Sequence, residues 1–159
     1  MQMLNFAYSD GITDVSLEYF MQHCPHMEVC VIECCIIHSD SILLSYDCKS
    51  HISLQALLIG GYSSISDSSI IAMSTHWPYL HSIDLTNSEL SDHAMASLLC
   101  NPQYKWRKLW IDWTCIEDRT LRAILKVASG SLELLSMRRC SKLTVCNGDG
   151  PNPMLLVAN

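Results

Sequence analysis

The segment Ile12-Thr13-Asp14-Val15-Ser16-Leu17 sets the frame of this chain, because its pattern returns four more times. In each copy an apolar residue stands two before an aspartate, except at His38, and another stands three after it. The gaps between these aspartates are 26, 27, 25 and 26 residues, and the aspartates are Asp14, Asp40, Asp67, Asp92 and Asp118. A fixed period of about 20 to 50 residues indicates a repeat array, in which each unit buries its apolar face against its neighbours.

A second ladder, of apolar residues, runs in register with the aspartates. Its members are 27, 26, 26 and 26 residues apart and are Met27, Leu54, Leu80, Trp106 and Leu132. Each opens the pattern apolar-x-x-apolar-x-apolar, whose last four residues alternate as a short half-buried strand does. The sequence therefore predicts strands within 1–6, 27–32, 54–59, 80–85, 106–111 and 132–137, with helices after the aspartates.

The spacing also predicts how the strands pair. About 20 residues lie between consecutive strands, which is room for a helix and two turns and therefore favours parallel pairing. We expect an α/β solenoid with a curved parallel sheet on its concave side and helices on its convex side. Residues 1–144 are its array, a partial first repeat plus five units. Residues 145–159 are expected to be an irregular tail, because Val145 replaces an aspartate and Gly and Pro follow it.

The repeat resembles the long, cysteine-containing form of the leucine-rich repeat. Ile12–Leu17, Cys24-Pro25-His26-Met27 and Trp77-Pro78-Tyr79-Leu80 carry the resemblance, with Cys34 or Cys35, Cys115 and Cys140 at the strand ends. The second full repeat departs from it, with His38 in an apolar slot and Gly60-Gly61-Tyr62 in place of a cysteine.

This form of repeat is best known from F-box leucine-rich-repeat proteins, the substrate receptors of Skp–cullin–F-box (SCF) ubiquitin ligases. The resemblance therefore implies a protein-binding repeat region that recognises substrates for such a ligase. The alternative is an F-box-independent interaction scaffold, since similar repeats also occur without an F-box. The chain contains no F-box, and its abrupt ends lead us to expect a fragment, a truncated gene product or a splice product. The Skp adaptor would bind only through that missing F-box.

The aspartate ladder has a structural explanation that we prefer to a metal or catalytic one. Thr13, Ser39, Ser66, Ser91 and Glu117 precede the aspartates, and such residues accept hydrogen bonds from the free amides of a helix N-terminus. We therefore predict helix capping.

The nine cysteines favour neither disulfides nor zinc. Their number is odd, no secretory signal precedes them, and no Cys-x-x-Cys spacing occurs. We expect most of them to be reduced and buried, in a protein of the cytoplasm or nucleus.

Composition and motifs exclude several classes of function. No phosphate loop, nucleophile elbow or His-Glu-x-x-His motif occurs, so we expect neither an enzyme nor a cofactor. No run of about 18 apolar residues suggests a membrane span. Residues 1–104 hold eleven acids and one base (−10) and residues 105–159 nine bases and five acids (+4), which sum to the net charge of −6. The bases are scattered, so we do not expect nucleic acid to bind.

We expect a protein partner on the concave face, where side chains alternate with the core positions of the strands. Tryptophan and arginine are enriched among the residues that dominate protein interfaces, and an exposed apolar wall also marks such sites. The candidate contacts are Val31, Leu58, Asp84, Lys108, Trp110, Asp112, Trp113 and Arg138. For Trp113 we also consider that it folds over the turn.

Overall fold

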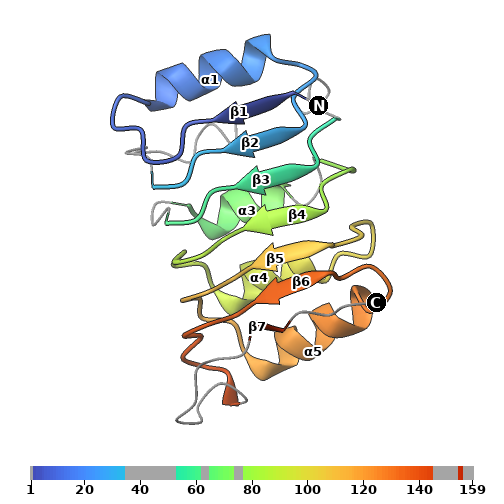
Figure 1. Cartoon of the computed structure of the whole chain (residues 1–159). Helices are drawn as coiled ribbons and strands as arrows, with labels where there is room; N and C mark the ends of the chain where they lie inside the picture. The colour runs from blue at the N-terminus through green and yellow to red at the C-terminus, as the bar shows by residue number, and fades with distance from the viewer. Residues whose placement is uncertain (1, 35–52, 62–64, 74–76, 145–153, 156–159) are drawn as a thin grey trace.

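The fold is built on a β-sheet whose strands lie side by side in chain order. The computed structural model describes residues 2–34, 53–61, 65–73, 77–144 and 154–155. One sheet runs through the molecule in the order β1 to β7, and Figure 1 shows its strands one below another. Their bounds are β1 Met3–Asn5, β2 Val29–Val31, β3 Ala56–Leu58, β4 Ser82–Asp84, β5 Lys108–Trp110, β6 Leu134–Ser136 and β7 Met154–Leu155.

The register of the sheet follows the period of the sequence. Paired residues of consecutive strands, such as Met3 with Val29 and Ala56 with Ser82, are 26 or 27 positions apart along the chain. Leu57 pairs with Ile83 in parallel, as the spacing predicted. The open α/β arrangement with six parallel strands is therefore confirmed.

The last strand differs from our expectation. Residues Met154–Leu155 form β7, which pairs antiparallel with β6. The irregular tail that we predicted for residues 145–159 thus contains a short strand.

Each described helix begins on a ladder aspartate. The helices are α1 (Asp14–His23), α3 (Asp67–Met73), α4 (Asp92–Leu99) and α5 (Asp118–Val127), and in Figure 1 α3 and α4 lie behind the sheet. The ladder position Asp40 lies outside the described residues. Among the described helices, none has both the length and the apolar composition needed to cross a membrane.

A continuous core fills the space between the sheet and the helices. The central residue of each inner strand is fully buried, as are the apolar residues that open the strand patterns, for example Trp106. From the helices, Leu98 and Ile124 join the same cluster. Because alternate strand residues point to opposite sides, the first and third residues of each three-residue strand face away from the helices. We call this side the strand face.

Helix capping is confirmed, but by the residues that precede the aspartates. The Oγ atoms of Thr13, Ser66 and Ser91 accept hydrogen bonds from amides three residues on, at 3.2–3.3 Å. Glu117 makes no such bond with its side chain. The aspartates themselves are the first helical residues, so capping does not explain them.

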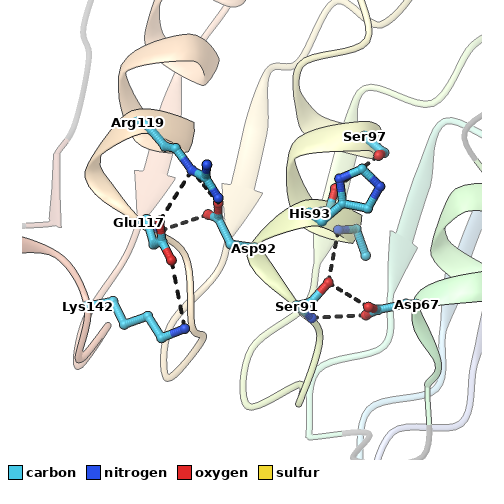
Figure 2. Close-up of polar contacts among 9 residues, drawn as sticks. Asp67, Ser91, Asp92, His93, Ser97, Glu117, Arg119 and Lys142 are labelled. Atoms are coloured by element: carbon cyan, nitrogen blue, oxygen red, sulfur yellow. Dashed lines mark hydrogen bonds and ion pairs between the residues drawn. The ribbon is translucent and has the colours of Figure 1, made fainter.

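Three of the aspartates join one unit to the next, as Figure 2 shows for Asp67 and Asp92. Asp67 accepts two hydrogen bonds from Ser91, and Asp92 accepts one from the amide of Glu117 at 2.8 Å. Asp118 accepts bonds from the amide and the hydroxyl of Thr144. Three of the five ladder aspartates, Asp67, Asp92 and Asp118, are therefore polar ties between units, whereas the buried Oδ1 atom of Asp14 has no hydrogen-bond partner among the described residues.

These bonds hold the carboxylates in their charged form. The hydroxyl of Ser91 lowers the pKa of Asp67, and the hydroxyl of Thr144 lowers the pKa of Asp118. Burial raises the pKa of Asp92, but hydrogen bonds from Glu117, Thr120 and Arg119 outweigh it and leave the pKa below its ordinary value. Asp92 is only 6% exposed, and Arg119 pairs with it at 3.1 Å.

The expectation that most cysteines are buried is only partly right. The six described cysteines are free thiols; Cys30 and Cys140 are buried and two others are half-buried. Cys34 and Cys115 are exposed. They stand where the chain leaves a strand, which is a surface position.

Candidate protein-binding face

The predicted contact residues on the strand face differ in how far they are exposed to solvent. Lys108 is exposed, while Leu58, Asp84 and Trp110 are half-buried. Val31 is only 7% exposed, between Asn5 and Leu58 in the register of its neighbours. The expected apolar wall is therefore narrower than predicted, because Val31 offers almost no surface to a partner.

A ladder of left-handed residues follows the strands. Its members are Tyr8 (φ 59°), Cys34 (φ 53°), Gly61 (φ 79°), Asn87 (φ 58°), Trp113 (φ 58°) and Arg139 (φ 58°), which are again 26 or 27 residues apart. L-residues with such φ values are uncommon and cost roughly 1–2 kcal/mol each. The same left-handed turn is therefore built into every unit, with strain at the five L-residues and none at Gly61.

Backbone hydrogen bonds between units hold this ladder in place. The amide of Tyr8 donates to the carbonyl of Glu33 at 2.9 Å, and the amide of Trp113 donates to the carbonyl of Arg138 at 2.7 Å. Cys34, Gly61 and Asn87 donate in the same way. Two large side chains of the ladder project into solvent: Tyr8 is 74% exposed and Trp113 is 56% exposed.

A hollow of about 420 Å³ opens along this ladder, at the carboxyl ends of the strands. Its lining includes the exposed rings of Tyr8 and Trp113, the carboxylates of Glu33 and Asp84, and Gly60. A Cβ atom on Gly60 would lie 2.8 Å from Oδ2 of Asp84. The glycine that departs from the cysteine-containing repeat is thus the residue that admits the carboxylate.

The two carboxylates of the hollow are harder to ionise than usual. Burial raises the pKa of Glu33, and the negative charge of Asp84 raises it further. Burial also raises the pKa of Asp84; the charge of Asp112 adds to this effect, and the hydrogen bonds from Thr86 oppose it. A positive charge placed in the hollow would relieve this repulsion.

The candidates beyond β5 form a more basic region. Asp112 accepts hydrogen bonds from the hydroxyl of Ser136 at 2.7 Å and from the amide of Arg138 at 2.6 Å. The side chain of Arg138 is exposed. The guanidinium of Arg139 lies 5.1 Å from the ring centre of Trp113, which is the distance of a cation–π contact. The ring of Trp113 thus contacts a residue of the next unit and, at 56% exposed, lies outside the core.

The structure brings only some of the predicted candidates together. Asp84 and Trp113 line the hollow, whereas Lys108 and Trp110 lie on β5 itself. The predicted contacts did not include Glu33, Gly60 or Gly61, which also line the hollow. The paired glycines, at a position where the other units carry side chains, were the signal in the sequence.

A second hollow, of about 620 Å³, lies at the opposite edge, where the strands begin. Tyr79, His81, Arg107 and Glu133 contribute to its lining. Arg107 is already paired with Glu133 at 2.5 Å, and burial lowers the pKa of His81. None of the predicted contacts lines it.

No metal centre emerges from the described part of the chain. There, no three histidine, cysteine or acidic side chains are grouped so that they could share an ion. In the segment His23–His26, Nδ1 of His23 lies 2.8 Å from the carbonyl of Tyr19, and Cys24 packs against the hydrophobic core.

A comparison with known proteins found no family model that matches the chain and no curated protein with significant sequence similarity. Any functional interpretation of the strand face therefore depends on its own geometry and chemistry.

Proposed function

We propose that this chain is a leucine-rich-repeat solenoid that binds another protein through its strand face, which would be the concave side. Its role would be substrate recognition for an SCF-type ubiquitin ligase. The ladder of exposed rings carries this proposal: the inter-unit hydrogen bonds hold Tyr8 and Trp113 in solvent beside the hollow. Tyrosine and tryptophan are among the residues most enriched at the energetic centres of protein interfaces.

The charge pattern of the face supports a protein partner. Carboxylates gather near β2 to β4, and exposed Lys108 and Arg138 lie at β5 and beyond. A surface with separate acidic and basic regions orients a partner and suppresses wrong ones. We therefore propose a binding module without catalytic activity or cofactor, working in the cytoplasm or nucleus.

The link to ubiquitin ligation rests on the resemblance of the repeats. Its test is affinity capture of the full-length protein from cell extract, probed for the Skp adaptor and a cullin. Capture of both supports the ligase role. Capture of other proteins without them favours the alternative, an F-box-independent scaffold.

A further inference from the structure

We propose that the hollow beside Gly60 holds basic side chains of an extended segment of the protein partner, placed between Tyr8 and Trp113. This inference rests on the proposed function and names the chemistry of its partner. The occupant is cationic and peptidic, and its positive groups lie against the carboxylates of Glu33 and Asp84.

The dimensions of the hollow suit such a segment. Tyr8 and Trp113 stand four units apart on the ladder, with Cys34, Gly61 and Asn87 between them. Neighbouring strands are about 4.8 Å apart, so the two rings are separated by roughly 19 Å. An extended peptide advances about 3.3 Å per residue, so about six residues span this length.

The residues between the rings leave room for it. Gly61 has no side chain, and the side chains of Cys34 and Asn87 are short, so the ladder residues between the rings of Tyr8 and Trp113 project less far from the sheet than those rings do. Gly60 opens the space that the carboxylate of Asp84 occupies. A Cβ atom at either glycine would meet a side chain of the lining, the carboxylate of Asp84 at Gly60 and the Sγ atom of Cys34 at Gly61.

The chemistry of the lining favours a cation. Burial raises the pKa of both carboxylates, and a negative neighbour raises each further, Asp84 for Glu33 and Asp112 for Asp84, so their charged forms gain from a positive neighbour. In the described residues no metal-binding group is present, which leaves an organic cation as the better fit. Trp113 already receives the guanidinium of Arg139, so a ring of this surface accepts basic side chains.

Two exposed thiols provide a direct test. Cys34 lines the hollow and Cys115 does not, yet both are exposed. The full chain is treated with iodoacetamide while hexa-arginine or hexaglutamine is present, and mass spectrometry follows each cysteine. We expect hexa-arginine to slow alkylation of Cys34 about tenfold and leave Cys115 unchanged, with no effect of hexaglutamine. Equal protection of both thiols, or none, overturns the proposal.

Matched variants separate the hollow from general charge attraction. Glu33→Gln with Asp84→Asn removes two charges from the hollow, and Asp10→Asn with Glu89→Gln removes two exposed charges elsewhere. Hexa-arginine affinity, measured by fluorescence anisotropy, should fall about tenfold in the first pair and less than about twofold in the second. Equal losses mean non-specific attraction and contradict the proposal. Circular dichroism confirms that both variants fold.

A second copy of the chain is the competing occupant, because its basic half complements the hollow. If sedimentation shows self-association that Glu33→Gln with Asp84→Asn abolishes, the occupant is a copy and the proposal is wrong. Affinity for a captured partner separates this inference from the proposed function. If Trp110→Ala weakens partner binding but Glu33→Gln with Asp84→Asn does not, this inference alone is refuted. If the chain binds hexa-arginine but neither variant changes its affinity for the partner, the proposed function alone is refuted.

Discussion

Ser91 is tied to Asp67 of the preceding unit by two hydrogen bonds, from its amide to Oδ1 at 2.9 Å and from its hydroxyl to Oδ2 at 2.5 Å. The same hydroxyl accepts a bond from the amide of Ala94 at 3.2 Å and so caps α4. One serine therefore fixes the start of its own helix and its distance from the previous helix (Figure 2).

This relationship predicts the cost of removing the carboxylate. Asp67→Ala should lower the free energy of unfolding by about 1–2 kcal/mol, because two hydrogen bonds between units are lost. Urea unfolding at pH 7 measures the change. Glu89→Ala is the control: Glu89 is exposed, and its variant should stay within about 0.5 kcal/mol of the parent. Equal effects of the two changes would show that the tie contributes nothing.

The position of Asp84 in the hollow predicts that removing its negative charge increases the stability of the folded chain. The folded-state pKa of Asp84 lies above its ordinary value of 3.8, so the folded state binds its proton more tightly than the unfolded state. The contribution of Asp84 to stability is therefore largest below pH 3.8 and declines as pH rises through the folded-state pKa. Asp84→Asn, which stays neutral, should be more stable than the parent at pH 7 and gain nothing at low pH. Thermal melts between pH 3 and 7 test this, and a gain that is constant across that range would contradict it.

The aspartate ladder predicts the opposite dependence on pH. The pKa of Asp67 is lowered by Ser91, so its stabilising contribution is present above the ordinary value of 3.8 and lost as pH falls through the folded-state pKa. The stability difference between the parent and Asp67→Asn should therefore shrink on acidification below pH 4. A difference that grows in acid would mean that the carboxylate is not held in its charged form.

Gly60 predicts a steric conflict with a named partner. In Gly60→Ala the new methyl group would meet the carboxylate of Asp84, and such overpacking costs about 1–3 kcal/mol. Combining it with Asp84→Ser should recover most of that loss in a double-mutant cycle, because the shorter side chain withdraws. Gly130→Ala is the matched control, since nothing lies within 4 Å of its Cβ position. Additive effects of Gly60→Ala and Asp84→Ser would exclude the contact.

The strand face predicts which surface a partner contacts. Trp110 lies on the strand face and Lys126 on the outer side of α5, where it is exposed. Trp110→Ala should weaken binding of a captured partner by about 2 kcal/mol, while Lys126→Ala should cost less than about 1 kcal/mol. Isothermal titration calorimetry with the full-length protein measures both. A larger effect at Lys126 would place the interface on the helices.

Much of the fold was determined by the sequence itself. The period of 26 predicted the strand positions, the parallel register and the helix starts, because each depends on local alternation and on spacing. Leu57 pairs with Ile83, and α5 begins at Asp118, as that period requires. These features involve one unit and its immediate neighbour, so a single repeated pattern specifies them.

Tertiary structure decided which of the candidate residues share one site. Asp67, Asp92 and Asp118 proved to be ties between units, since a carboxylate bonds to whichever amide the next unit brings near it. Burial of Val31 and exposure of Tyr8 depend on side chains from adjacent strands, which residue type does not reveal. The hollow likewise gathers Tyr8, Glu33, Asp84 and Trp113 from residues more than 100 positions apart. Its shape and its raised carboxylate pKa values arise only when the stacked units place these groups together and exclude water between them.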